Sequence, residues 1–441
     1  MERKRLAVIG AGVAGLGAAW LLSRRHEVRL YERERALGGH SHTVAVDSPH
    51  GELGVDTGFV VYNEPNYPQL TALFAHLGVE TQATDMSFAA SIDDGRVEYA
   101  GSDLNTLFAQ RANLVSPAYW GMLRDILRFN RDAKRSLRTG DADGLDLGAY
   151  LARGGYGERL VEHYLLPMAA AIWSCPTATM RAFPASGFLR FFANHGLLDV
   201  VGRPQWQTVT GGSRRYVEKL AARLDGRFVV GHPATRVSRQ GDGVWVTAGD
   251  GSRERYDGVV LACHADDALR LIDRPLPNER AVLGRFRYQQ NRTLLHCDAT
   301  LMPRQRRVWS SWNYLAQTRR GATERVSVTY WMNRLQGLPG DRQYFVSLNP
   351  LREPSPAEVV AEMTYDHPVF DADAVRAQPL LDGLQGRDRL WFCGSYAGYG
   401  FHEDAFASAV RVAARLGAST PWATPSTAAD DDAPVARAAA S

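Results

Sequence analysis

Lysine is rare in this chain: lysine and arginine together number 51, yet only Lys4, Lys134 and Lys219 are lysines. The net charge is only +3 and no basic stretch is interleaved with aromatic residues, so the sequence does not predict a nucleic-acid-binding protein. Cysteine is equally sparse and lacks C-x-x-C spacing; the four are Cys175, Cys263, Cys297 and Cys393. These absences indicate reduced thiols and no structural zinc.

Long apolar runs are also missing. No stretch approaches the roughly 18 consecutive apolar residues that a membrane-spanning helix needs. The apolar segment Leu6–Leu22 follows a basic start, as in a secretory signal, but glycines interrupt it and a second predicted strand follows in place of a cleavage site. We therefore expect a cytoplasmic protein, and leave open a peripheral contact with the inner face of the membrane.

Glycine is what the N-terminal segment has in abundance, in the pattern G-x-G-x-x-G. Gly10, Gly12 and Gly15 come directly after the apolar strand Leu6–Ile9. Gly10 permits a tight turn, Gly12 lets a pyrophosphate approach the backbone, and Gly15 lets the next helix pack close to the strand. The start of that helix, around Ala14, presents unpaired N–H groups and its positive dipole end to phosphate. The pattern predicts a dinucleotide site at these residues.

Two further features extend the predicted site. Glu32 follows the second strand, Val28–Tyr31, at a place where a carboxylate accepts hydrogen bonds from ribose hydroxyls. A second glycine turn, Gly38–Gly39, comes soon afterwards. The further candidate cofactor contacts after this turn are His40 and Thr43.

A strand–glycine–helix element near the C-terminus favours FAD over a nicotinamide cofactor. The strand Leu390–Cys393 precedes Gly394, and Glu403 and Asp404 open the apolar helix 405–416. Acidic side chains there can accept hydrogen bonds from ribityl hydroxyls, and the helix N-terminus stabilises negative charge on a reduced flavin. We therefore expect Gly394, Glu403 and Asp404 to contact FAD. Because Cys393 lies within the strand, we expect the FAD to be non-covalent, with His40 as the remaining candidate for a covalent link.

Several motifs at both ends of the chain carry a family resemblance: Gly39–Thr43, Asp56–Phe59, His367–Asp371, Trp391–Gly394 and Gly400–Asp404. The chain resembles the flavin-containing amine oxidase and phytoene desaturase superfamily. It is most similar there to a bacterial group of NAD/FAD-binding oxidoreductases associated with cyclopropane fatty-acid synthase-like methyltransferases. The resemblance implies an FAD-dependent oxidoreductase, a hydrophobic or lipid substrate and a methyltransferase as a candidate partner.

The predicted fold class is α/β, with a doubly wound Rossmann-type FAD domain and an intertwined α+β substrate domain of mixed sheet and helices. We assign residues 1–100, 205–265 and 386–418 to the FAD domain, residues 101–204 and 266–385 to the substrate domain, and residues 419–441 to a disordered tail. The strands predicted for the substrate sheet are Thr293–Cys297, Val308–Trp312, Val326–Trp331 and Tyr344–Leu348.

Catalytic candidates lie in the loop after Gly394. Tyr396, Tyr399 and Phe401 form either an aromatic wall for the substrate or the packing of the loop itself. Tyr399 and His402 are our catalytic candidates, since an imidazole can shuttle protons near neutral pH. His402 can equally serve by hydrogen-bonding to the backbone or the flavin.

Three other histidines have quieter interpretations. His40 and His42 could form a metal pair, but no third ligand lies near them, so cofactor contact or loop packing is favoured and no metal is expected. His367 is a weaker candidate for the substrate or flavin side and is expected in a structural turn.

An aromatic stretch between residues 160 and 206 is either a hydrophobic core or the wall of a long apolar channel. Its members are Trp173, Phe183, Phe188, Phe191, Phe192, Leu197, Leu198 and Trp206. If it is a channel, Arg181 and Arg190 lie at its mouth and suit an acyl chain with an anionic headgroup.

Four functions follow from these observations. The first is a desaturase or dehydrogenase of fatty-acyl or phospholipid chains, with hydride transfer to flavin N5. The second is an amine oxidase, although relatives of that class place a lysine near flavin N5. In this chain no lysine follows Lys219 in the sequence. The third is an FAD-dependent double-bond isomerase. The fourth is a non-enzymatic flavoprotein or an assembly partner for a methyltransferase.

Overall fold

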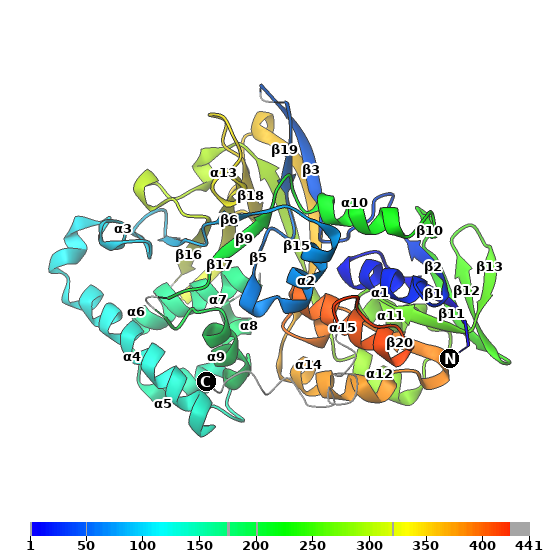
Figure 1. Cartoon of the computed structure of the whole chain (residues 1–441). Coiled ribbons are helices and arrows are strands. Elements are labelled where there is room, and N and C mark those ends of the chain that lie inside the picture. The colour runs from blue at the N-terminus through cyan, green and yellow to red at the C-terminus, as the bar shows by residue number, and fades with distance from the viewer. Residues whose placement is uncertain (1, 50, 174–176, 200–201, 320–321, 424–441) are drawn as a thin grey trace.

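The computed structural model describes residues 2–49, 51–173, 177–199, 202–319 and 322–423. A five-stranded parallel sheet forms one end of the molecule, at the right of Figure 1. Its strands in spatial order are β10 (Phe228–Val230), β2 (Glu27–Glu32), β1 (Arg5–Ile9), β14 (Gly258–Leu261) and β20 (Leu390–Phe392). β1 pairs with β2 on one side and β14 on the other, which creates the crevice at strand ends where this class of sheet binds ligands.

Two helices cover one face of this sheet, α1 (Val13–Ser23) and α15 (His402–Arg415). They pack closely because Gly17 has no side chain: a Cβ there would lie 2.6 Å from the ring of Phe406. The remaining helices of this region are α2 (Pro68–Leu77), α10 (Arg214–Arg223), α11 (Ala265–Leu271), α12 (Pro277–Leu283) and α14 (Ala372–Ala377). An antiparallel meander, β11 (Ala234–Gln240), β12 (Gly243–Ala248) and β13 (Arg253–Tyr256), completes it.

A mixed sheet of seven strands forms the core of the second region. Its spatial order is β19 (Val359–Val369), β15 (Arg287–His296), β18 (Phe345–Leu348), β17 (Ala322–Trp331), β16 (Trp312–Arg319), β7 (Phe88–Ile92) and β8 (Val97–Ala100). Smaller sheets pair β3 (Thr43–Ser48) with β4 (Gly51–Asp56), and β9 (Trp206–Val209) with β5 (Val61–Asn63) and β6 (Thr81–Thr84).

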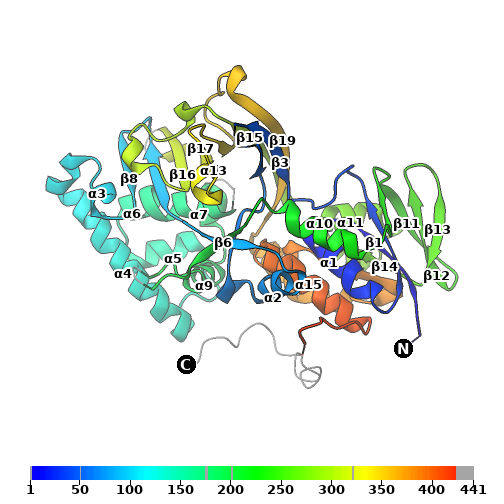
Figure 2. The ribbon, with the colours of Figure 1, turned by 45° about the horizontal axis from the view of Figure 1, so that its top comes forward.

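Helices extend from this sheet to the far end of the molecule (Figures 1 and 2). They are α3 (Leu104–Leu107), α4 (Pro117–Thr139), α5 (Leu147–Gly154), α6 (Glu158–Leu160), α7 (Leu166–Trp173), α8 (Thr177–Arg181) and α9 (Ala185–Asn194). The short helix α13 (Met332–Gln336) follows β17. Among the helices of the described residues, none is both long and apolar enough to cross a bilayer.

The fold confirms the predicted α/β class and corrects several details. The segment expected as a strand at 308–312 is a 3-10 turn that ends at Val308, and β16 begins only at Trp312. Strands β7 and β8 lie in the mixed sheet, although residues 1–100 were assigned to the FAD domain; that division otherwise stays a prediction. Trp422, which was assigned to the expected tail, is packed in the fold, because it stacks on Trp20 with ring centroids 6.0 Å apart. Residues 424–441, and Cys175, lie outside the described residues.

Candidate functional site

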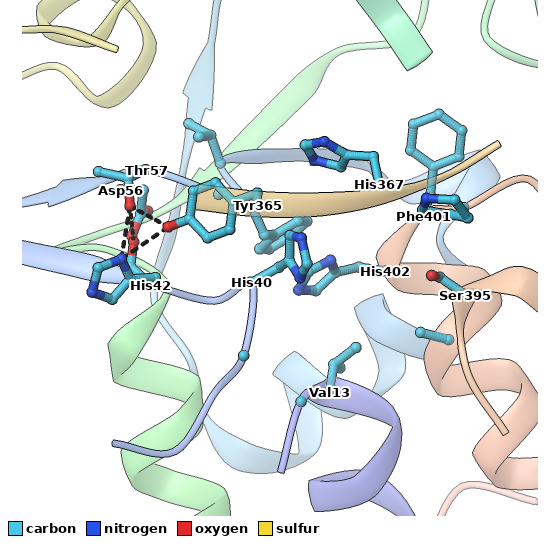
Figure 3. Close-up of a pocket in the computed structure, with 18 of the residues that line it drawn as sticks. Val13, His40, His42, Asp56, Thr57, Tyr365, His367, Ser395, Phe401 and His402 are labelled. Atoms are coloured by element: carbon cyan, nitrogen blue, oxygen red, sulfur yellow. Dashed lines mark hydrogen bonds between the residues drawn. The ribbon is translucent and has the colours of Figure 1, made fainter. Parts of the chain in front are cut away.

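One large cavity joins the two regions. Its volume is about 1830 Å³, and it runs from the ends of the parallel strands to a space between α7, α9 and the mixed sheet. Ligand pockets commonly measure about 300–1,000 Å³, so this cavity has room for a dinucleotide and a second molecule together. Figure 3 shows the central part, with Val13 at the start of α1 below the histidines.

The glycines of the first motif make the cofactor end of this cavity. Gly10 has φ +100° and lies against Ala262, where a Cβ would come within 2.8 Å of the carbonyl oxygen. A Cβ on Gly15 would lie 1.7 Å from the Gly10 oxygen, so this glycine brings the helix onto the turn and does not itself line the cavity. A Cβ on Gly12 would meet nothing within 4 Å, because Gly12 borders the open cavity. This is a cradle that a side chain would fill and a pyrophosphate fits.

The second glycine turn lies directly beside the first. Gly38 N–H donates to the Ala11 carbonyl at 2.9 Å, and a Cβ on Gly39 would approach Gly12 Cα to 3.1 Å. Gly38, Gly39, Ala14 and Gly394 all line the cavity, as expected for cofactor contacts.

Glu32 also lines the cavity, and its carboxylate is already held by backbone donors. Its Oε2 accepts from Ala11 N–H at 2.7 Å and its Oε1 accepts from Glu34 N–H at 2.9 Å. Each oxygen retains acceptor capacity for a ribose hydroxyl. The structure thus gives Glu32 a second task, which is to brace the glycine turn.

Besides Gly15, three predicted cofactor contacts are corrected, because none of them lines the cavity. Both oxygens of Glu403 accept backbone N–H groups of Gln69 and Leu70, each at 2.9 Å, at the start of α2. Asp404 caps its own helix by accepting the Phe401 N–H at 2.9 Å. Thr43 donates its hydroxyl to Asp56 at 2.5 Å. All three acidic or hydroxyl groups therefore organise the segments around the cavity instead of touching its contents.

Asp56 is a site residue that the sequence reading missed as an individual contributor. Its carboxylate accepts from Ser213 N–H at 2.9 Å and from Gln336 Nε2 at 3.2 Å. It thereby joins β4, the start of α10 and helix α13, and burial raises its pKa to about 6. The signal was the motif Asp56–Phe59, which was noted without a role.

His40 faces the cavity with an unused hydrogen-bonding atom. Its Nε2 is buried and has no hydrogen-bond partner, and its ring lies 5.0 Å from the Tyr365 ring. Burial, with His367 nearby as the next cause, lowers its pKa well below the usual value, so the imidazole is neutral. An orphaned polar atom at this position fits a cofactor contact.

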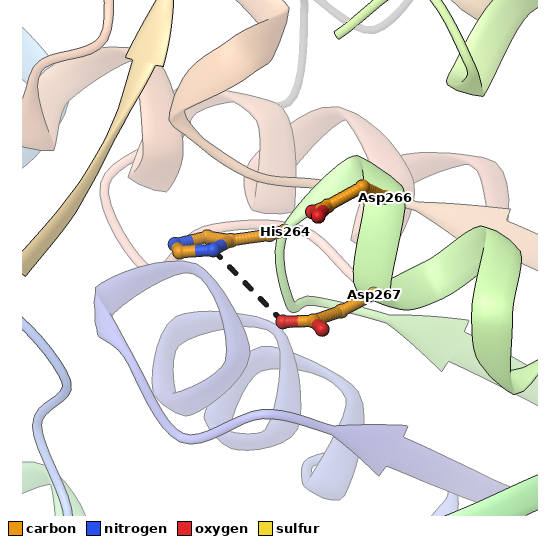
Figure 4. A group of neighbouring side chains, drawn as sticks. All are labelled: His264, Asp266 and Asp267. Atoms are coloured by element: carbon orange, nitrogen blue, oxygen red, sulfur yellow. Dashed lines mark ion pairs between the residues drawn. The ribbon is translucent and has the colours of Figure 1, made fainter. Parts of the chain in front are cut away.

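His42 makes contacts of the loop-packing kind that was favoured for it over a metal pair with His40. His42 Nδ1 is engaged by Thr57 Oγ1 at 3.0 Å and Tyr365 OH at 2.9 Å (Figure 3). Another group, His264 with Asp266 and Asp267, has its ligand atoms within 4.8 Å of one another (Figure 4). Arg270 forms ion pairs with both of these carboxylates, so their charge is already compensated.

His402 hydrogen-bonds to a side chain and not to the backbone, the protein partner expected for it. Its ring stacks on Phe59 at 3.9 Å, and its Nε2 lies 2.8 Å from the Ser41 hydroxyl. Burial lowers its pKa to about 3, which makes it a poor proton acceptor at neutral pH. Its assignment as a proton shuttle is therefore opposed by its surroundings.

The three aromatic residues of the C-terminal loop divide between core and cavity. Tyr396 borders the cavity but is buried and packs on Phe286 at 5.1 Å, in the core under the parallel sheet. Tyr399 and Phe401 line the cavity and contact Phe191 of α9, at 6.0 and 5.0 Å between ring centroids. Tyr399 keeps its place as a candidate for substrate contact.

The aromatic stretch between residues 160 and 206 is both core and channel. Those of its residues that line the cavity are Trp173, Phe191, Leu197 and Trp206. Those that pack in the helical core without lining the cavity are Phe183, Phe188, Phe192 and Leu198. The arginines expected at the mouth are not there: Arg181 pairs with Glu162, and neither it nor Arg190 lines the cavity. Exposed Arg203, which the sequence reading missed, does.

His367 lies on strand β19 instead of in a turn, and a chain of hydrogen bonds fixes its protonation. Arg292 N–H donates to Asn349 Oδ1 at 3.0 Å, so the Asn349 amide group must point toward Asn291. Asn349 Nδ2 then donates to Asn291 Oδ1, and Asn291 Nδ2 donates to His367 Nδ1, each at 2.7 Å. His367 Nδ1 is therefore an acceptor and Nε2 carries the proton. Burial lowers the pKa of this cavity-lining imidazole to about 4, so it is a neutral donor.

Comparison with known proteins agrees with this site. The family model described as flavin-containing amine oxidoreductase matches residues 13–285. AofH of Mycobacterium tuberculosis, named as a flavin-containing monoamine oxidase, is 28% identical over 292 residues, or 62% of this chain and 60% of that protein. A carotenoid phi-ring synthase of Chlorobaculum tepidum is 26% identical over 206 residues, or 43% of this chain and 30% of that protein. The chain thus spans at most about 60% of the length of the curated relatives it matches.

Solved structures show the same fold at low sequence identity. Putrescine oxidase with bound putrescine has a TM-score of 0.67 at 16% identity, covering 94% of this chain and 99% of that one. A fatty acid isomerase of P. acnes that produces CLA has a TM-score of 0.62 at 16% identity, covering 94% and 98%. Cyclohexylamine oxidase of Brevibacterium oxydans has a TM-score of 0.63 at 14% identity, covering 94% and 100%.

Proposed function

The chain belongs to the family of flavin-containing amine oxidoreductases, and from that premise we propose that it oxidises a carbon–hydrogen bond of a substrate with a large apolar part. The observation that carries this proposal is the apolar, aromatic continuation of the cofactor cavity, lined by Trp173, Phe191, Tyr399 and Phe401. FAD, when bound, accepts the hydride that such a reaction releases.

The residues of this chain have defined tasks in that reaction. The glycine turns at Gly12 and Gly39 hold the pyrophosphate, and Glu32 and His40 offer acceptor and donor groups beside them. The side chains of Tyr399 and Phe401 form one wall of the substrate space and exclude water from it. His367 presents a neutral Nε2–H into the cavity, where it would donate a hydrogen bond to an atom on which negative charge develops as the hydride is accepted, without transferring a proton.

An amine is the first candidate substrate, since AofH is named as a monoamine oxidase and the structural neighbours include oxidases of cyclohexylamine and of the diamine putrescine. Two cavity carboxylates differ in their pairing: Asp85 is paired with Arg334, whereas Asp366 Oδ1 has no hydrogen-bond partner. No lysine of the described residues lines the cavity, and Lys219 instead donates to the Leu77 and Gly78 carbonyls.

A fatty-acyl chain is the second candidate, for desaturation or double-bond isomerisation. Two observations favour it: the apolar lining from α7 and α9, and the single exposed guanidinium of Arg203 among the cavity residues of that helical side, which suits a carboxylate. The fatty acid isomerase among the structural neighbours shows that the fold accommodates such a ligand in at least that protein.

An anaerobic titration separates these candidates. The purified yellow protein is mixed with a panel of amines, then with fatty acids and phospholipids bearing unsaturated, methyl-branched or cyclopropane chains, and the oxidised flavin absorbance is followed. Bleaching by an amine supports the first candidate, and bleaching by an acyl chain supports the second. Altered acyl chains without bleaching indicate isomerisation, and a protein that purifies without flavin overturns the proposal.

A variant pair links the result to the cavity. Phe191→Leu opens the apolar wall and should change the preferred chain length or amine. Phe188→Leu, on the core face of the same helix, should lower stability and leave the preference unchanged.

A further inference from the structure

Exposed apolar side chains gather at one end of the molecule. Of the seven large apolar side chains exposed in the described part of the chain, five lie within residues 104–127. They are Leu104 (74% exposed), Leu114 (49%), Val115 (84%), Trp120 (51%) and Leu127 (60%). We call these five residues the α3–α4 surface. Such a concentration marks an interaction site, because isolated apolar residues on a surface are ordinarily scattered.

The same segment is strongly basic. Residues 104–139 contain seven arginine and lysine residues and two aspartates, although the whole chain carries a net charge of only +3. Along α4, Trp120, Arg124, Leu127, Arg131 and Arg138 recur at helical spacing and are all exposed. Of the two aspartates, Asp125 is buried and accepts the Gly157 N–H, and half-buried Asp132 pairs with Arg131. The exposed positions of the stripe itself alternate apolar and cationic groups.

The α3–α4 surface also adjoins the cavity. Exposed Gly101 and Ser102 line the cavity immediately before α3, so the cavity reaches the molecular surface beside Leu104. Figures 1 and 2 both place α3 and α4 at the end of the molecule opposite the parallel sheet. An occupant of this surface would therefore face the helical end of the cavity and leave the cofactor domain free.

We propose that the α3–α4 surface docks on an anionic phospholipid bilayer, with Trp120 and Leu127 in the headgroup boundary and the arginines on lipid phosphates. A helix with tryptophan and leucine among arginines has the composition of helices that lie in the membrane interface. Anionic headgroups complement its charge. A second copy is a poor occupant, because a symmetric contact would bring the arginines of both copies together.

Docking on a bilayer does not depend on the proposed function. The delivery of an acyl chain from the bilayer into the cavity does rest on the proposed function. A bilayer would place acyl chains next to the opening at Gly101 and Ser102. The two claims are tested separately, since vesicle binding is measured without turnover.

Co-sedimentation with vesicles tests the docking. The full-length holoprotein should sediment with vesicles of phosphatidylcholine and phosphatidylglycerol, less with phosphatidylcholine alone, and less at high salt. Leu127→Glu and Arg124→Glu should each lower the partition coefficient by roughly tenfold or more, because each removes a favourable contact and adds a repelled charge.

Two matched variants make the result specific. Leu380→Glu alters another exposed leucine (54% exposed), and Arg223→Glu makes the same charge change on α10; both should bind vesicles like the wild type. Flavin content and thermal unfolding confirm that all four variants fold. The proposal is overturned if the wild type ignores anionic vesicles, if the matched variants lose binding equally, or if the α3–α4 variants instead abolish a dimer or a complex with a methyltransferase. Binding without conversion of any acyl chain leaves docking intact and removes the lipid candidate from the proposed function.

Discussion

The two ends of the cavity are built in different ways. The cofactor end is largely backbone, where glycine turns at residues 10–12 and 38–39 meet and Gly394 joins them. The apolar end is made of side chains from α7, α9, β16 and β19, which are distant in sequence. A backbone surface needs one residue type at each close approach and so leaves a motif. A side-chain surface needs only apolar bulk, as a hydrophobic core does, and leaves no distinct pattern.

The largest expected effect comes from a substitution that disrupts the backbone turns at the cofactor end of the cavity. Gly15→Ala places a Cβ 1.7 Å from the Gly10 carbonyl oxygen, and neither the helix nor the turn can yield without moving the other. We expect destabilisation of more than about 3 kcal/mol and loss of bound flavin, measured by thermal unfolding and absorbance.

Gly12→Ala is the control that separates binding from folding. Its Cβ meets nothing within 4 Å, so flavin-free stability should stay within about 1 kcal/mol of wild type while flavin content falls. Full flavin retention by this variant would contradict the role of Gly12.

The next effect concerns the boundary between the two ends, at His367. His367→Leu removes the Nε2–H donor and should lower the rate of flavin reduction by roughly 10²–10³-fold, measured by stopped flow with the substrate found above. His367→Gln carries an amide donor at a similar reach and should retain more of the rate.

Asn291 tests whether the direction of this donor matters. Asn291→Asp replaces the donor to His367 Nδ1 by an acceptor and should favour the opposite tautomer of the neutral ring. The same change at Asn313, also fully buried in the mixed sheet but bonded to backbone groups, should leave the rate of reduction unchanged. Equal rate losses in both variants would indicate a merely structural role.

A smaller effect, dependent on pH, concerns the carboxylate beneath the cofactor loop. Burial raises the pKa of Glu403 to about 7 from the ordinary 4.5. A raised folded-state pKa contributes stability that is fully present below about pH 4.5 and is lost as the pH rises to about 7. The free energy of unfolding of wild type relative to Glu403→Gln should therefore fall by about 1–3 kcal/mol across this window, measured by denaturant titration. A pH-independent difference would contradict it.

The smallest expected effect comes from a substitution at the apolar end of the cavity and concerns substrate binding. Arg203→Gln removes an exposed guanidinium at the cavity rim and should raise KM for a carboxylate-bearing substrate by roughly three- to tenfold, because exposed ion pairs contribute little. KM for an uncharged amide of the same chain should stay the same. Arg190→Gln, which alters an exposed arginine outside the cavity lining, is the control.

The role of a residue was predictable when it depends on neighbouring residues in the sequence. It was not predictable when it depends on a partner far away in the sequence. The tight turn at Gly10 and the close helix packing at Gly15 were predictable because both depend on a strand and helix that adjoin these glycines in sequence. Glu403 and Asp404 were expected at FAD because they open a helix; a distant partner, the start of α2, engages Glu403. Phe188 and Phe191 show the same limit, since one turn of α9 separates a core residue from a cavity residue and composition does not distinguish them.

The sequence by itself determined the α/β class, the glycine turns and the flavin family. Close approach between backbone segments admits only glycine, so each such approach leaves a glycine motif in the sequence. Only the tertiary structure decided which aromatic residues face the cavity and that Arg203 instead of Arg181 stands at its rim. It alone also decided that Asn349 and Asn291 orient His367. These properties depend on which distant segments the two sheets bring together, and the chemistry of a side chain becomes specific only when its partners are in place.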